Sequence, residues 1–155
     1  MTIITLSTFI NAPIERCFDL SRSVDLHMLS VKQTKEKAIA GVTTGHMNEG
    51  DWVMWEAVHF GIKQRLSTRI TAMERPVYFC DEQMEGAFKS MRHEHHFELE
   101  DGGTIMKDVF CYETPYGLAG WLFDVVVLKR YMTHFLRLRN VTIKNVAEGG
   151  NGKLY

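Results

Sequence analysis

The order of hydrophobic and polar residues divides the chain into strands and helices. Residues 2–10 alternate between two sets of side chains, and this period of two predicts a β-strand. The period then changes, because Ile14, Cys17 and Phe18 fall at the i, i+3, i+4 spacing of one helix face. Residues 24–30 predict a second short helix.

The rest of the chain separates into a strand-rich part and a long helix. Residues 32–115 have strand-like runs separated by turn signals, which predict six further strands with antiparallel neighbours. Residues 116–147 contain no proline and predict one amphipathic helix of roughly 45 Å at 1.5 Å per residue. Its apolar face would consist of Trp121, Val125, Leu128, Met132, Phe135, Ile143 and Val146.

This order of elements predicts an α+β fold. A curved antiparallel sheet of about seven strands would wrap around the long C-terminal helix, with two short helices after the first strand. One domain would span residues 1–148, and the glycine-rich residues 149–155 would form a flexible tail. Space between the sheet and the helix would provide a ligand cavity.

Composition and charge narrow the classes of function. The chain has 18 Lys and Arg against 19 Asp and Glu, so it has no positive surplus with which to bind nucleic acid. The apolar residues 118–128 are too few to span a membrane. Cys17, Cys80 and Cys111 are widely spaced in apolar runs, which indicates buried thiols and a reducing, cytoplasmic location.

Histidines concentrate in the segment "MRHEHHFELE", residues 91–100. Alternation predicts that His96 lies on the outer face of this strand. In the next strand, an outward Lys107 would place Asp108 and Tyr112 inside, with Asp108 beside the inward histidines. The side chains predicted to face inward from the histidine strand are Met91, His93, His95, Phe97 and Leu99.

The element order resembles the helix-grip fold of the START-like (SRPBCC) superfamily, which includes lipid-transfer START domains, plant pollen allergens and polyketide cyclases. Residues 53–117 are similar in particular to small bacterial members. The motif positions are Phe79, Asp81, Gly86, Phe88, His93, His95, Phe97, Gly103, Thr104, Asp108, Tyr112 and Pro115. Met91 stands where such proteins often have a tryptophan, which would leave a roomier pocket wall. The resemblance implies that residues 1–148 form one START-like domain, and it does not imply one activity.

Three interpretations of the histidine cluster are open from the sequence. His93 and His95 could only hold the strands together through hydrogen bonds to Asp108 or Tyr112. They could instead form the polar end of an apolar cavity and orient a ligand. In the third interpretation they bind zinc with His59 or Asp108, or the cluster performs acid–base catalysis, with His95 and Asp108 as candidates. Because the His-x-His spacing is common and no cysteine supports it, we expect no metal or cofactor.

Other polar residues belong to the same predicted cavity. Trp55 and His59 share one strand face, so both would face inward if Trp55 does. Asp81 and Gln83 share a face with Phe79, which indicates either a wet cavity rim or the outer surface of a twisted strand.

The predicted function is binding of a small hydrophobic or amphipathic molecule, as in a lipid-binding protein. Arg139 lies on the apolar helix face, and we expect its charged end to extend to the rim, with contact to an acidic ligand group as the alternative. The rival functions are a polyketide cyclase-like or dehydratase-like enzyme in the same cavity and an interaction module with a filled core. The predicted ligand-binding residues are Trp55, His59, Phe79, Asp81, Gln83, Met91, His93, His95, Phe97, Asp108, Phe110, Tyr112, Met132 and Arg139.

Overall fold

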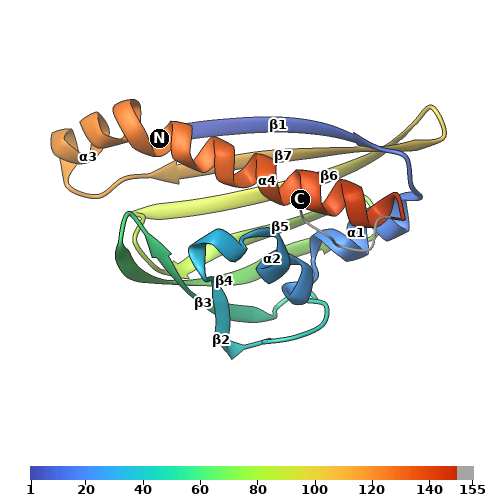
Figure 1. The fold of residues 1–155 in the computed structure, drawn as a ribbon, viewed down its shortest axis with the longest axis horizontal. Coiled ribbons are helices and arrows are strands. Elements are labelled where there is room, and N and C mark those ends of the chain that lie inside the picture. Colours follow the sequence, from blue (N-terminus) through green and yellow to red (C-terminus); the bar gives the residue numbers. More distant parts are fainter. Residues whose placement is uncertain (150–155) are drawn as a thin grey trace.

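Seven strands form one curved antiparallel sheet in the computed structural model, which describes residues 1–149 (Figure 1). The strands are β1 (Thr2–Ile10), β2 (Lys37–Gly41), β3 (Trp52–His59), β4 (Ile62–Glu74), β5 (Tyr78–Glu85), β6 (Ser90–Glu100) and β7 (Gly103–Glu113). Their order in the sheet is β1-β7-β6-β5-β4-β3-β2. The first and last strands along the chain, β1 and β7, are therefore neighbours in the sheet.

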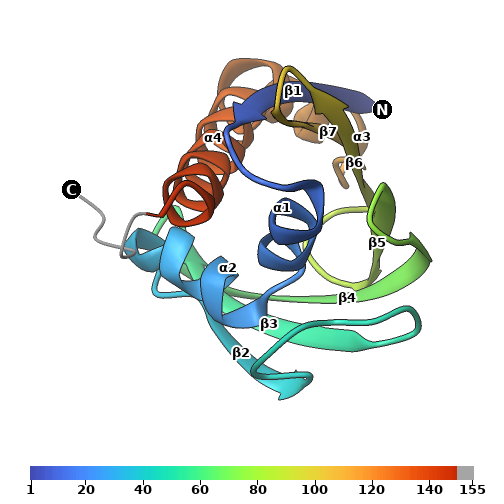
Figure 2. The same ribbon diagram turned by 90° about the vertical axis from the view of Figure 1, so that its right-hand side faces the viewer.

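Helical segments lie between β1 and β2 and after β7. The first group contains α1 (Ile14–Ser21), α2 (Val24–Ser30) and the short 3₁₀ turn η1 (Lys32–Thr34). The second contains α3 (Gly117–Phe123), the π-helical segment η2 (Asp124–Leu128) and α4 (Lys129–Ala147). In end view, the sheet curves around α1 and α4, and α2 lies beside α4 at the open side (Figure 2). The architecture is the predicted helix-grip arrangement.

The main apolar core occupies one end of the space enclosed by the sheet. The Phe18 ring of α1 lies 5.5 Å from the Phe79 ring of β5 and 5.4 Å from the Phe97 ring of β6, measured between ring centroids. Ile143 of α4 and Met106 of β7 are buried in the same cluster. The short helix α1 thus fills this end of the space that the sheet encloses. It does not cover the rest of the concave face.

The period of two in β6 and β7 brings polar side chains to the concave face. His95 is paired with Asp108 across β6 and β7, and His93 is paired with Asp81 across β6 and β5. All four side chains therefore project from adjacent positions on one face of three neighbouring strands. This register positions the candidate site.

The long helix differs from the single regular helix predicted. Trp121 and Val125 were expected on the buried face but are 56% and 58% exposed, whereas Gly120 and Asp124 are buried. The π-helical segment η2 shifts the phase of the residues before it, and α3 extends beyond the sheet (Figure 1). The prediction for Trp121 and Val125 is wrong because it assumed an uninterrupted α-helical period.

Two smaller predictions also need correction. Leu99 was expected to face inward but is 74% exposed, because the end of β6 continues past the core toward the β6–β7 turn. Cys17 and Cys80 are buried free thiols as predicted, whereas Cys111 is only half-buried because it faces outward on β7. Among residues 1–149, no helix is long and apolar enough to cross a membrane. The predicted flexible tail, residues 149–155, lies outside the described residues except for Gly149.

Phe18→Ala is expected to lower the free energy of unfolding by about 3–5 kcal/mol, because it leaves a cavity among buried aromatic rings. Urea unfolding followed by circular dichroism measures this loss. Phe9→Ala is the matched control, since the Phe9 side chain is 40% exposed and its removal should cost much less. Equal losses in the two variants would contradict the assignment of Phe18 to the core.

Candidate functional site

A cavity of about 740 Å³ lies between the concave face of the sheet and the helices α3 and α4. Small-molecule sites commonly have volumes of this size. Its wall is mainly apolar, and the aromatic and aliphatic side chains in it include Trp55, Phe79, Met91, Phe110, Met132 and Leu136. The core is therefore not filled, which contradicts the structural premise of the interaction-module alternative.

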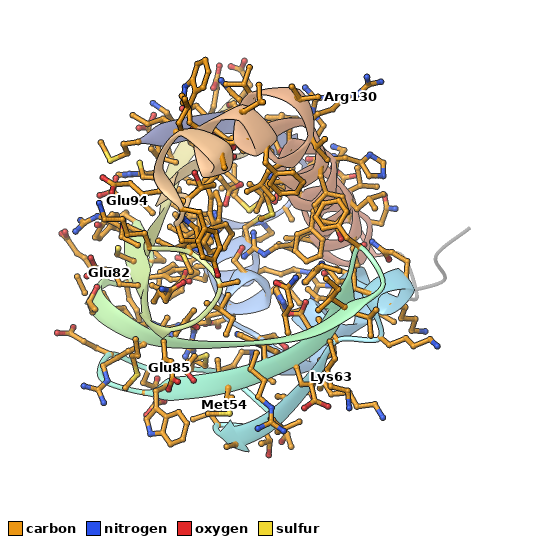
Figure 3. The ribbon with its side chains drawn as sticks, turned by 90° about the vertical axis from the view of Figure 1, so that its left-hand side faces the viewer. Met54, Lys63, Glu82, Glu85, Glu94 and Arg130 are labelled. Carbon is orange, nitrogen blue, oxygen red and sulfur yellow. The ribbon has the colours of Figure 1, made fainter. Side chains whose placement is uncertain are left out.

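The mouth of the cavity is marked by the wall residues that are most exposed. Phe60 lies in the β3–β4 turn, Ile62 begins β4, Tyr116 precedes α3, and Phe123 ends it. Figure 3 views the molecule from the end at which α3 lies. The Phe60 and Phe123 rings contact each other at 5.6 Å between centroids, so the β3–β4 turn and the end of α3 meet at this mouth.

The polar end of the cavity is formed by two histidines and two aspartates. His93 Nε2 lies 2.9 Å from Asp108 Oδ1, and His95 Nε2 lies 2.9 Å from Asp81 Oδ1. His95 Nδ1 is 3.0 Å from Asp108 Oδ1, but the direction is unsuitable for a hydrogen bond and this buried atom has no hydrogen-bond partner among residues 1–149. The His95 ring thus lies between two carboxylates, and it stacks on Phe79 at 4.1 Å between centroids.

Asp108 is fully buried and has further partners on α4. Asn140 Nδ2 donates to Asp108 Oδ2 at 2.6 Å, and Arg139 Nη1 donates to Asp108 Oδ1 at 3.4 Å. Arg139 Nη2 also donates to the Ser21 carbonyl at 3.0 Å, so it connects α4 to α1. The expectation that Arg139 extends to the rim is wrong: its side chain is buried, because a buried anion and a free helix carbonyl satisfy its guanidinium inside the protein.

The environment of the cluster fixes the charges of its aspartates. Burial by itself raises the pKa of Asp108, but the hydrogen bond from His93, the close approach of His95 and the charge of Arg139 outweigh burial and hold that pKa well below its usual value. The pKa of Asp81 is lowered in the same way, chiefly by the His95 hydrogen bond acting against burial. Both carboxylates are therefore anionic at neutral pH.

His93 is neutral at the same pH. Burial, followed by the proximity of His95, lowers the pKa of His93 to about 4, although the two aspartates oppose this shift. Two anions, Asp81 and Asp108, then lie near one guanidinium, that of Arg139.

Asp81, His93 and His95 could also bind a metal ion. Each offers one ligand atom, and these atoms lie within 4.8 Å of one another. Two imidazoles and one carboxylate are donors suited to Zn²⁺ or Fe²⁺. The sequence indicated His59 or Asp108 as the third ligand, but His59 Nδ1 instead lies 2.7 Å from the Tyr131 hydroxyl, and burial lowers the pKa of His59.

Most of the predicted ligand-binding residues line the cavity, namely Trp55, His59, Phe79, Asp81, Met91, His93, His95, Phe110, Met132 and Arg139. Their role in binding stays a prediction. The wall does not include Gln83, Phe97, Asp108 or Tyr112.

These four side chains contact other protein groups, and their predicted role in ligand binding also stays a prediction. Gln83 donates to the Phe88 carbonyl, and Phe97 packs against Phe18 in the core. Asp108 lies behind the histidines, and Tyr112 donates its hydroxyl proton to buried Asp124. Phe97, Asp108 and Tyr112 are buried on the inner face as their strand period predicts, but protein groups occupy the space beside them.

Sequence reasoning missed several contributors to the site. Asn140 and the Ser21 carbonyl complete the surroundings of Asp108 and Arg139, and Tyr131 is the partner of His59. Asn140 could have been suspected, because it follows Arg139 within a helix face that otherwise contacts the core. The Ser21 carbonyl carries no comparable signal in the sequence.

The fold is the helix-grip fold implied by the resemblance to START-like proteins. Among solved structures, TTHA0849 from Thermus thermophilus has a TM-score of 0.74 and 19% identity, covering 94% of this chain and 99% of that one. Protein Ms6760 from Mycobacterium smegmatis has a TM-score of 0.67 and 19% identity, covering 93% and 89%. Ginseng major latex-like protein 151 from Panax ginseng has a TM-score of 0.65 and 16% identity, covering 94% and 97%.

These TM-scores establish a shared fold, and identities this low leave the activity open. No family model matches the chain, and no curated protein matches it. The functional argument therefore rests on the cavity and its polar end.

The low pKa of His93 predicts a pH-dependent stability. The unfolded chain binds a proton at this residue below pH of about 6.5, whereas the folded protein does so only below about 4, so stability is lost as pH falls through that window. Between pH 7 and pH 5 the contribution is about 2 kcal/mol. Urea unfolding at the two pH values should show a smaller pH dependence for His93→Gln than for the wild type.

His96→Gln is the matched control for this measurement. His96 lies on the outer face of the same strand, with 38% of its side chain exposed. This variant should keep the pH dependence of the wild type. If His93→Gln also kept it, the neutral buried state of His93 would be refuted.

Proposed function

We propose that the protein binds a small hydrophobic or amphipathic molecule in the cavity between the sheet and α4. The observation that carries the proposal is a cavity of about 740 Å³ whose apolar wall leads to a buried polar cluster. Such a combination suits a ligand with an apolar body and one polar group. Free cysteines are consistent with the cytoplasm as the place of binding.

Burial of the ligand's apolar surface would supply most of the affinity. At about 25 cal/mol per Å², burial of about 300 Å² would contribute about 7 kcal/mol before the entropic cost of association. The polar cluster would set the orientation of the ligand through the groups in the wall, His93, His95 and Asp81. These groups can donate to a carbonyl and accept from a hydroxyl.

The charge of the cluster favours some polar groups over others. Arg139 already pairs with Asp108, and the second carboxylate, Asp81, has no guanidinium of its own among the described residues. A carboxylate or phosphate on the ligand would meet this excess of negative charge. We therefore propose a neutral hydroxyl, phenol or carbonyl, or a cationic group, at the polar end, in place of the acidic group considered for Arg139.

Acid–base catalysis is the second candidate function, and the position of His95 between Asp81 and Asp108 favours it. Because Nε2 and Nδ1 of His95 face Asp81 and Asp108, a ligand would have to take the place of the Asp81 carboxylate at Nε2. In that position Nε2 would donate a proton to a ligand carbonyl or accept one from an adjacent carbon, as in a cyclase or dehydratase. Asp108 would act only as a positioning residue, because it lies outside the wall and its low pKa keeps it ionised.

Ala57→Phe should weaken binding of the neutral fluorescent probe N-phenyl-1-naphthylamine at least tenfold, because Ala57 lines the cavity and the added ring would occupy it. A fluorescence titration measures the dissociation constant. Ile39→Phe is the control, since Ile39 is 40% exposed and is not part of the cavity wall. Probe binding that is unchanged in Ala57→Phe would contradict the proposed site.

Native mass spectrometry of the purified protein, followed by extraction, would identify a retained compound and provide the material for a test of catalysis. If the protein only binds this compound, His95→Asn should raise the dissociation constant, and the wild type should leave the compound unchanged. If it is an enzyme, the wild type should convert the compound and His95→Asn should not. Conversion by His95→Asn at the wild-type rate would eliminate the acid–base role of His95.

A further inference from the structure

The outer side of α3 and η2 carries an apolar stripe that faces solvent. Within α3, Leu118, Trp121 and Leu122 are spaced at i, i+3 and i+4 and so lie on one side of the helix. Val125 and Val126 of η2 continue the exposed side, whereas Gly120 and Asp124 are buried. Each residue of the stripe is more than half exposed, and these residues are Leu118, Trp121, Leu122, Val125 and Val126. Exposed apolar residues that are contiguous in this way mark an interaction surface, whereas isolated ones do not.

Contacts on the opposite side hold this stripe outside. Asp124 is buried and accepts hydrogen bonds from Tyr112 and Thr2, which fixes the helix to β7 and β1. Gly120 lies so close to the Pro115 carbonyl that a Cβ there would be 1.8 Å from its oxygen. The helix therefore cannot rotate to bury the stripe without breaking these contacts.

A basic zone continues the same side of the helix into α4. Val125 shares a shallow surface depression with Lys129, Arg130, Thr133, His134 and Arg137. The only acidic residue from position 116 to 147 is Asp124, which is buried. Arg130 points away from the sheet, and the labelled glutamates Glu82, Glu85 and Glu94 lie on the sheet side of the molecule (Figure 3).

We propose that the docking face, defined as Leu118, Trp121, Leu122, Val125, Val126, Lys129, Arg130 and Arg137, binds the surface of a bilayer that contains anionic lipids. The apolar part would enter the boundary between headgroups and acyl chains, as the apolar sides of interfacial helices do. The three cations behind it would contact anionic headgroups. The end position of α3 in the molecule allows its tip to enter first (Figure 1).

Charge favours a lipid surface over a second copy of the chain. Two docking faces brought together would place Lys129 and Arg130 of one copy near the same cations of the other. The face contains no carboxylate with which to pair them. An anionic bilayer offers an apolar boundary to the apolar residues of the docking face and anionic headgroups to its cations.

Docking would also bring the cavity mouth near the bilayer, because Tyr116 and Phe123 of the mouth belong to the segment that carries the stripe. The path of an apolar ligand between the membrane and the cavity would then be short. This consequence rests on the proposed function, whereas docking itself does not depend on it.

Vesicle flotation tests the proposal with two compositions, phosphatidylcholine alone and phosphatidylcholine mixed with phosphatidylglycerol. The wild type should bind the mixed vesicles, and added salt should weaken this binding. Trp121→Ser combined with Leu122→Ser should lower the partition coefficient at least tenfold. Lys129→Glu combined with Arg130→Glu should lower it by at least about fivefold per cation lost.

Two control variants carry the same types of substitution elsewhere. Leu99→Ser changes an exposed leucine at the β6–β7 end, and Lys107→Glu reverses an exposed charge on β7. Both should bind vesicles as the wild type does. Probe binding to the cavity, measured without vesicles, should be the same in all these variants and thus reports separately on the proposed function.

Two results would overturn the proposal. The first is vesicle binding that does not depend on the docking face. It would be seen as no preference for phosphatidylglycerol vesicles or as equal binding by the double variants and the wild type. The second is a wild-type dimer in sedimentation velocity that Trp121→Ser with Leu122→Ser converts to a monomer, without vesicle binding. That result would assign the face to a second copy of the chain.

Discussion

The burial of Asp108 as an anion is the constraint on which the arrangement of sheet and helices depends. An isolated carboxylate in this position would be strongly destabilising, so the chain must bring partners to it. His93 and His95 come from β6, and Arg139 and Asn140 come from α4. Arg139 also reaches the Ser21 carbonyl at the end of α1. One buried charge thereby joins the sheet, the short helix and the long helix at the base of the cavity.

This constraint separates structural from chemical roles within the cluster. The residue with the most partners, Asp108, is enclosed and permanently ionised, so it cannot exchange protons with a ligand near neutral pH. Asp81 and His95 share a hydrogen bond and reach the cavity wall, where a ligand would contact them. The same group of residues can therefore stabilise the fold and orient or protonate a molecule, because different members face different sides.

The sequence predicts the parts of the structure that follow a regular period. Alternation in β6 and β7 was sufficient to place His93, His95 and Asp108 on the concave side, and the element order was sufficient for the sheet and the gripping helix. The π-helical segment was not predictable from a count at helical spacing, which misplaced Trp121 and Val125. The contacts of Arg139 were also missed, because its partners come from distant parts of the chain.

The π-helical segment Asp124–Leu128 determines which side of the helix tip faces the sheet. Each residue of an α-helix turns the chain by about 100°, so one residue inserted or removed in this segment would rotate everything before it by about that angle relative to α4. Asp124 and Gly120 would then leave their partners on β7 and the preceding loop. Homologous chains should therefore conserve the length of this segment more strictly than its composition, and an alignment gap there would indicate a differently oriented helix tip.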